Sequence, residues 1–161
     1  MKIDLEYIKD ILTVFIEAET AHITFADLKK AGIPHDENGD INQKFLFHYQ
    51  ILIDNELVSL SSLEIGNLKH MGIYQSLDGQ WGVVLKDLRL TQTGHDFAQS
   101  LANKEVFSKL KSEFKDFPFK VIFDSGRKLL EHVAKKKMDN FGFKILIRKP
   151  FKAIELRLVF D

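Results

Sequence analysis

The stretch "LRLTQTGHDFAQSL", residues 88–101, decides the fold, because a β-like pattern runs directly into a capped helix. Leu90 ends an alternating apolar segment. Thr91 or Thr93 suits the N-cap of the next helix, since a threonine hydroxyl accepts a hydrogen bond from a backbone N–H of the first turn. Phe97 and Leu101 lie one turn apart and can face one core. The pattern predicts a strand ending at Leu90 and a helix beginning beside it.

Three helical patterns precede this stretch. Residues 4–18 repeat apolar side chains at helical spacing, with Asp4 as the N-cap. Thr24 begins a short helix over residues 25–31, in which Asp27 completes a capping box and Gly32 is a stop signal. A polar turn at residues 34–40 follows. The third helix runs from about Asn42 to Asn55, with Asp40 or Asn42 as its cap. Its apolar face comprises Leu46, Tyr49, Ile53 and Leu57.

A β-hairpin with a long tip is predicted between the third helix and the opening stretch. A short strand begins at Leu57, and residues 81–90 alternate as the returning strand. The resulting order is helix, helix, helix, strand, strand, helix. This order is typical of the winged helix, a helix-turn-helix variant with a β wing. We therefore predict an α+β winged-helix domain over residues 1–103.

Residues 104–161 are predicted to be a C-terminal helical and β-hairpin extension packed on that domain. One helix covers residues 104–117, and Pro118 stops or kinks it. Helix then resumes, with Gly126 as a close-packing point. Its inward positions are Ile122, Leu129, Leu130 and Val133. Two period-two runs between Phe141 and Phe160 predict a terminal β-hairpin, whose apolar face must cover the helices or a second chain.

Composition narrows the class of protein. The chain has 161 residues, 45% of them hydrophobic, which is enough to bury a core. The absence of Cys excludes disulfide scaffolds, thiolate zinc sites and Cys nucleophiles. The N-terminus lacks a signal-peptide pattern and no apolar run approaches the length of a membrane span, so we expect a cytoplasmic protein that does not bind a membrane.

The charge is unevenly distributed along the chain. Residues 1–103 carry 8 Lys/Arg and 15 Asp/Glu, a net charge of −7, whereas residues 104–161 carry 15 and 8, a net charge of +7. Such asymmetry is typical of a surface for nucleic acid or for an acidic partner. Mutual neutralisation of the two parts, in the fold or in a dimer, explains it equally well.

Three segments stand out as motifs: Met1–Asp4 at the start, Phe47-His48 in the predicted third helix and Leu90–Phe97 after the predicted hairpin. Together they resemble the pattern of a family of small bacterial proteins of unknown function that are common in prophages and mobile elements. The family pattern opens with Met-Lys-Arg-Asp, places a Tyr-His pair in the third helix, and continues with Leu-Thr-x-x-Gly-His-(Glu/Asp)-Phe after the wing. Here Met1–Asp4, Phe47-His48 and Leu90–Phe97 occupy those places. Ile3 replaces the usual basic residue, and the terminal hairpin is an addition. The resemblance covers roughly the first 135 residues and implies a winged-helix fold without an established activity.

In a helix-turn-helix the predicted third helix enters the major groove of double-stranded DNA. The candidate contacts on it are Asn42, Gln43, Lys44, Phe47, His48 and Gln50. The alternative is a solvated helix face, because Lys44 is the one basic residue of the set and phosphate contacts require cations.

The stronger basic feature lies towards the C-terminus. The candidate phosphate contacts there are Arg127, Lys128, Lys135, Lys136 and Lys137, with Lys144, Arg148, Lys149 and Lys152 downstream. A solvated face, a nucleic-acid contact and an acidic protein partner are the three interpretations of this cluster.

Catalysis is the weakest hypothesis. His95 is the one candidate general base, but the adjacent Asp96 points elsewhere on a helix. Packing of His95 against the wing, with a hydrogen bond to a backbone carbonyl, is the structural alternative. The six His show no metal-ligand spacing, and no motif implies a cofactor. We therefore predict a non-enzymatic DNA-associated or regulatory protein of a mobile element; the alternative is a protein-interaction module, as a homodimer or an adaptor in phage–host conflict.

Overall fold

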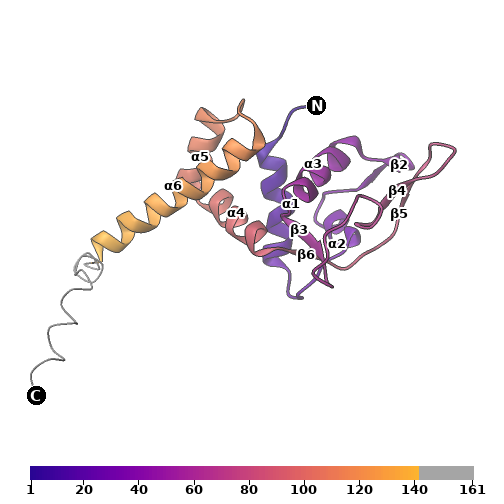
Figure 1. The fold of residues 1–161 in the computed structure, drawn as a ribbon, viewed down its shortest axis with the longest axis horizontal. Helices are drawn as coiled ribbons and strands as arrows, with labels where there is room; N and C mark the ends of the chain where they lie inside the picture. The colour runs from indigo at the N-terminus through magenta and orange to yellow at the C-terminus, as the bar shows by residue number, and fades with distance from the viewer. Residues whose placement is uncertain (142–161) are drawn as a thin grey trace, which may run out of the picture.

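The computed structural model describes residues 1–141, which form an α+β structure (Figure 1). Its helices are α1 Leu5–Glu17, α2 Phe25–Lys30, α3 Gln43–Asp54, α4 Gln92–Ala102, α5 Lys104–Glu113 and α6 Phe119–Asn140. Its strands are β1 Asp36–Glu37, β2 Asp40–Ile41, β3 Val58–Leu60, β4 Ile73–Gln75, β5 Trp81–Val83 and β6 Leu88–Leu90. Each described sheet is an antiparallel pair: β1 with β2, β3 with β6, and β4 with β5.

The predicted helix starts are confirmed by their caps. The Asp4 carboxylate accepts from the backbone N–H of Tyr7 at 3.1 Å, and Thr24 forms a complete capping box with Asp27. Asn42, not Asp40, caps α3, and Thr91, not Thr93, caps α4. Each cap satisfies N–H groups that have no partner within their own helix.

The pair β3–β6 joins the predicted third helix to the opening stretch. Val58 lies opposite Leu90 and Leu60 opposite Leu88, and Ile23 adds an antiparallel bridge to Leu88. The α1–α2 connection, the end of α3 and the start of α4 therefore meet at one small sheet.

The glycine of the opening stretch is explained at this junction. Thr91 donates its backbone N–H to the carbonyl of Leu57 at 3.0 Å and its hydroxyl to the carbonyl of Glu56 at 2.6 Å. The first turn of α4 consequently lies against the backbone at the start of β3. A Cβ on Gly94 would collide with the backbone carbonyl of Leu57, so this close approach requires glycine.

The prediction of one continuous returning strand over residues 81–90 is wrong, although its antiparallel pairing with the short strand after Leu57 and its end at Leu90 are confirmed. The structure divides it between β5, which pairs with β4, and β6, which pairs with β3. Between them Val84 donates its backbone N–H to Gly72, and Val84 and Leu85 are exposed. The polar turn predicted at residues 34–40 likewise contains paired residues, in β1 and the start of β2.

The segment between β3 and β6, residues 61–87, folds back onto α3. Met71 and Ile73 are fully buried, and the Tyr49 hydroxyl donates to the carbonyl of Met71 at 2.9 Å. The Tyr49 ring stacks on Phe45, and both rings pack edge-on against Phe25 of α2. The segment therefore belongs to the core of the N-terminal part, although its β4–β5 turn is exposed.

The three C-terminal helices pack on one another and, through α4, on α1. Phe97 of α4 contacts Phe119 and Phe123 of α6, with ring centroids 5.5 and 5.0 Å apart. Gly126 confirms the predicted close approach, since a Cβ there would lie 3.2 Å from the Leu110 side chain. The helix predicted for residues 104–117 ends earlier, at Glu113, and Phe117 is half-exposed in the α5–α6 turn.

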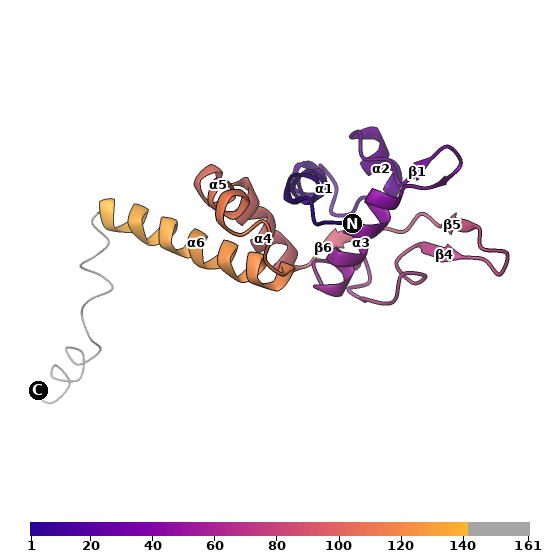
Figure 2. The same ribbon diagram turned by 90° about the horizontal axis from the view of Figure 1, so that it is seen from above.

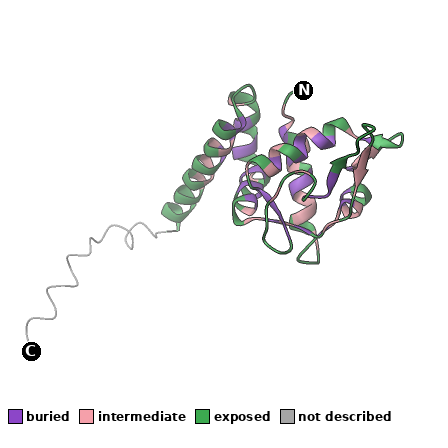
Figure 3. Cartoon of the chain, turned by 45° about the vertical axis from the view of Figure 1, so that its right-hand side comes forward, coloured by how far each residue is buried: buried purple, intermediate pink, exposed green. Residues whose placement is uncertain are grey.

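Helix α6 extends beyond its neighbours, as two perpendicular views show (Figures 1 and 2). Its first half is partly buried and its last turns are exposed (Figure 3). No described helix combines the length and apolar composition needed to cross a bilayer. The hairpin predicted between Phe141 and Phe160 lies outside the described residues, except for Phe141 itself.

Candidate interaction surfaces

His48 is buried, with 1% of its surface exposed, so its prediction as a nucleic-acid contact is wrong. Its Nε2 accepts the backbone N–H of Asp4 at 2.9 Å, and its Nδ1 lies 2.7 Å from the carbonyl of Lys44. Only a neutral ring protonated at Nδ1 makes both hydrogen bonds. Burial lowers the pKa of His48, which favours this neutral form. The ring thus ties the start of α1 to α3.

Lys44 is engaged by the same N-terminal residues. Its Nζ lies 2.8 Å from a carboxylate oxygen of Asp4 and 4.5 Å from the centroid of the Tyr7 ring. The hydrogen bond from Lys44 is the main cause of the lowered pKa of Asp4, so the pair is ionised and its charges offset each other. Asn42 is also occupied, because its side chain caps α3 at the N–H of Phe45. Asn42 and Lys44 thus each have a partner within the fold, but Lys44 is exposed, and their role as nucleic-acid contacts stays a prediction.

The outward face of α3 retains Gln43 and Gln50, which are exposed, and Phe47, which is half-buried. Beside it lies a groove of about 500 Å³, the α3 groove. It is lined by Phe47, Gln50, Ile51, Ile53, Asp54, Gly66, Asn67 and Leu68. Asp54 is the charged residue of this lining. The surface therefore offers amides, apolar side chains and a carboxylate rather than cations.

The predicted basic cluster lies on α6, and its cations are not equivalent. Arg127 pairs with Glu131 one turn away at 3.3 Å. Lys128, Lys135, Lys136 and Lys137 are exposed and form no ion pair with any described residue. The last three belong to residues 134–141, here named the α6 tip.

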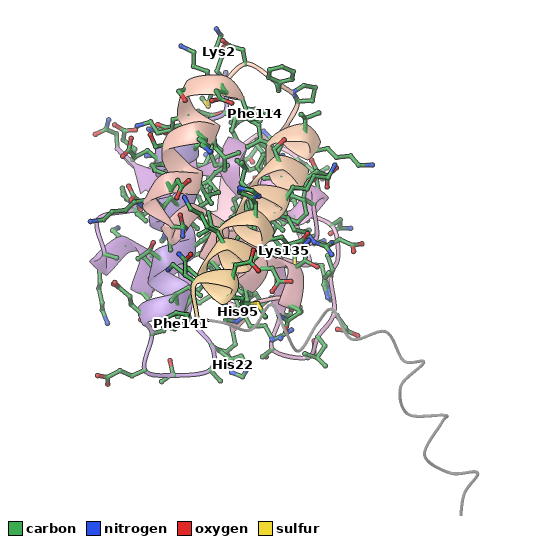
Figure 4. All side chains as sticks on the ribbon, turned by 90° about the vertical axis from the view of Figure 1, so that its left-hand side faces the viewer. Lys2, His22, His95, Phe114, Lys135 and Phe141 are labelled. Atoms are coloured by element: carbon green, nitrogen blue, oxygen red, sulfur yellow. The ribbon has the colours of Figure 1, made fainter. Side chains whose placement is uncertain are left out.

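Apolar side chains accompany the lysines on the α6 tip. Leu129, Leu130 and Val133, predicted to face inward, are half-buried against the core. Beyond them Met138 is 41% exposed and Phe141 is 79% exposed. Figure 4 labels Lys135 and Phe141 on this end of α6. The tip is thus both cationic and apolar.

A second groove, not predicted from the sequence, lies between α1 and α2. This α1–α2 groove has a volume of about 360 Å³. Its lining is Val14, Glu17, Ala18, Glu19, Thr20, Ile23, Asp27 and Ala31. One sequence signal pointed to it: α1 ends on Glu17 and has no basic residue in its last turn, although the negative end of a helix dipole favours cations.

His95 is half-buried on α4, and its side chain makes no hydrogen bond with residues 1–141. The backbone-carbonyl hydrogen bond predicted for it is therefore not found there. Within the same residues, no group of three or more His, Cys, Asp or Glu side chains gathers as metal ligands do.

Comparison with known proteins finds no matching family model, no matching curated protein and no matching solved structure. Function is therefore inferred from these surfaces alone.

Proposed function

We propose that the chain is a non-enzymatic protein-interaction module with a winged-helix N-terminal part, and that it self-associates through the α6 tip. The order α1, α2, α3, β3, β6 and the bridge from Ile23 to Leu88 support the winged-helix assignment. Residues 61–87 are then an enlarged wing that packs back on α3 instead of extending as one hairpin.

The main support for self-association is the exposure of apolar side chains on the α6 tip. Two turns of isolated helix are marginal in water, because helices gain most of their stability from packing an apolar face. Met138 and Phe141 have no such cover among the described residues. A second copy of the chain is always present at the same concentration. In a symmetric dimer each copy covers the tip of the other.

Molar mass in solution, measured by sedimentation equilibrium over a range of concentrations, tests this proposal. We expect a dimer that Met138→Asp weakens, since a buried unpaired carboxylate is costly. Leu77→Asp is the matched control, because Leu77 is an exposed apolar residue on the β4–β5 turn. A wild-type chain that stays monomeric throughout contradicts the proposed function.

Association with double-stranded DNA is the second candidate, favoured by the lysines of α6, which form no ion pair with any described residue. The outward face of α3 lacks the cations that phosphate neutralisation needs, so binding through α6 would follow the backbone without reading bases. Fluorescence anisotropy with random duplex DNA at several salt concentrations tests it. Replacing Lys135, Lys136 and Lys137 by Gln is expected to reduce the salt slope by about 3. Gln at Lys104 and Lys115 is the control, and salt-independent or absent binding contradicts this candidate.

A further inference from the structure

We propose that the α6 tip of one copy docks in the α1–α2 groove of a second copy, and that the second copy returns the same contact. This inference rests on the proposed self-association and names the two surfaces that meet. Among the described residues, Lys135, Lys136 and Lys137 of the tip form no ion pair, and neither do Glu17 and Glu19 of the groove.

The groove presents unpaired negative charge beside apolar surface. Ile23 is buried and Val14 half-buried, whereas Glu17 and Glu19 are exposed and form no ion pair with any described residue. Asp27 is already engaged by the Thr24 capping box. Two carboxylates of the groove therefore have no counter-charge within residues 1–141.

The end of α1 strengthens this negative potential. Glu17 is the last residue of the helix, where the unpaired carbonyl groups carry partial negative charge. An acidic residue at this end is unfavourable for an isolated helix, and no basic residue of the last turn offsets it. A cation from another molecule would offset both the charge of the Glu17 carboxylate and the partial negative charge of the carbonyl groups at the helix end.

The α6 tip has the complementary chemistry. Its eight residues span roughly 12 Å as a helix, and they carry three adjacent lysines with Met138 and Phe141. A groove of about 360 Å³ holds only a few side chains, which suits one apolar anchor with flanking charges. Lysine stems also cover apolar surface while their ammonium groups reach the rim.

The partner is a second copy rather than the same chain. Figures 1 and 2 show α6 running away from α1 and α2 in both views, so the tip does not reach the groove of its own chain. A twofold axis makes each copy donate its tip and accept the other, which closes the assembly as a dimer. The opposite net charges of residues 1–103 and 104–161 fit this exchange.

Charge reversal with mixing tests the contact in the full-length protein. One variant carries Glu17→Lys and Glu19→Lys, and the other carries Lys135→Glu, Lys136→Glu and Lys137→Glu. Alone, each variant places like charges together, so we expect its dimer dissociation constant to rise roughly tenfold or more. Mixed in equal amounts, the two variants make complementary pairs at both contacts, and we expect a heterodimer near wild-type affinity. Glu37→Lys with Glu113→Lys is the control, since both residues are exposed and unpaired among the described residues.

The mixture makes the outcome independent of folding defects in one variant, because a misfolded chain does not regain affinity by mixing. Failure of the mixture to associate more tightly than either variant overturns the proposed contact. If Met138→Asp weakens the dimer while the Glu17 and Glu19 reversal does not, self-association stands and this docking site is wrong. A monomeric wild type contradicts both the self-association and the docking contact. If the lysine reversal abolishes DNA binding but leaves the dimer unchanged, the tip binds nucleic acid instead.

Discussion

At the scale of single residues, Gly94 and His48 show how much depends on one side chain. Gly94 is the position where α4 meets the backbone of Leu57, and only the absence of a Cβ permits that approach. His48 is the position where the N-terminus meets α3, through one ring that accepts at Nε2 and donates at Nδ1. Each residue joins segments that are distant in sequence.

Gly94→Ala is expected to lower the free energy of unfolding by about 3 kcal/mol, because the new Cβ must displace backbone. Gly126→Ala is the matched control, since both glycines are buried inside helices and gain the same helix propensity. At Gly126 the tightest contact of the new Cβ, at 3.2 Å, is the end of the Leu110 side chain, which can move, and its contacts with Ser100 and Phe97 are at ordinary van der Waals distance. Urea unfolding of the two variants measures the difference, and an equal loss contradicts the role given to Gly94.

Stability is expected to fall as the pH drops below about 6.5, the ordinary pKa of histidine. Burial lowers the folded-state pKa of His48, so the folded chain binds fewer protons than the unfolded chain between the two pKa values. The contribution of the neutral His48 ring to stability is therefore complete above pH 6.5, and it is lost progressively as the pH falls towards the pKa of His48 in the folded chain. Asp4 stays ionised and Tyr7, whose pKa burial raises to about 12, stays neutral across this window.

Thermal unfolding between pH 5 and 8 checks this expectation. His48→Gln removes the titrating group while leaving an amide oxygen that can accept from Asp4, so its unfolding temperature is expected to vary less with pH. His22→Gln is the control, since its exposed ring has no partner among the described residues, and its unfolding temperature should vary with pH as in the wild type. A pH response that survives in His48→Gln belongs to another group.

The sequence predicted the capping residues but not the structural role of His48. The reason is that caps bond residues close in sequence, whereas the ring of His48 bonds a residue far from it in sequence. Asp4, Thr24 and Thr91 bond backbone groups two or three residues away, so their roles are visible in the local pattern. The residue that donates to His48 Nε2 lies 44 positions away in the sequence. His48 was predicted to face outward because it lies beside the apolar stripe of the predicted third helix, not within it. Long-range polar contacts leave no periodic signal.

At the scale of elements, the helices and the antiparallel pairing of β3 with β6 were predictable, but the division of residues 81–90 between two partner strands was not. Period-two alternation over residues 81–90 indicated one strand, but alternation does not specify the partner of each half. Here Trp81–Val83 pairs with β4 and Leu88–Leu90 with β3, with an exposed link between them. The α1–α2 groove escaped prediction for the same reason, since Glu19 and Asp27 become neighbours only after α1 and α2 fold together.

The docking of residues 61–87 on α3 is expected to depend on the hydroxyl of Tyr49. Tyr49→Phe keeps the ring stack on Phe45 but leaves the carbonyl of Met71 without its donor, which costs about 1–3 kcal/mol when the group is buried. Hydrogen exchange should then rise around Met71 and Ile73 more than in α1. An unchanged exchange pattern would show that side-chain packing alone holds the segment.

At the scale of the whole molecule, the distribution of charge was visible in the sequence and its placement was not. The basic residues of α6 lie on a helix that extends beyond the body, whereas the acidic end of α1 lies beside α2 (Figures 1 and 2). Composition alone allowed neutralisation within one chain. The described geometry keeps the α6 tip away from the α1–α2 groove and leaves Lys135 to Lys137 unpaired among the described residues.

Dimer affinity is therefore expected to fall as salt increases, because exposed lysine–glutamate attraction is screened over about 10 Å at 0.1 M ionic strength. The apolar contacts of Met138 and Phe141, which are buried only in the proposed dimer, should leave a part of the affinity that does not depend on salt. Sedimentation equilibrium at low and high sodium chloride measures both parts. An affinity that rises with salt would indicate an apolar interface without charge pairing.

The docked imidazole of His48 also provides a natural spectroscopic reporter. A ring proton at Nδ1 held by the carbonyl of Lys44 exchanges slowly with water and should give a separate downfield signal in proton NMR. The signal disappears when residues 1–4 detach, because water then reaches the ring. Attachment of the N-terminal residues can thus be followed in the unmodified protein, without any introduced label, during titration with acid or with a binding partner.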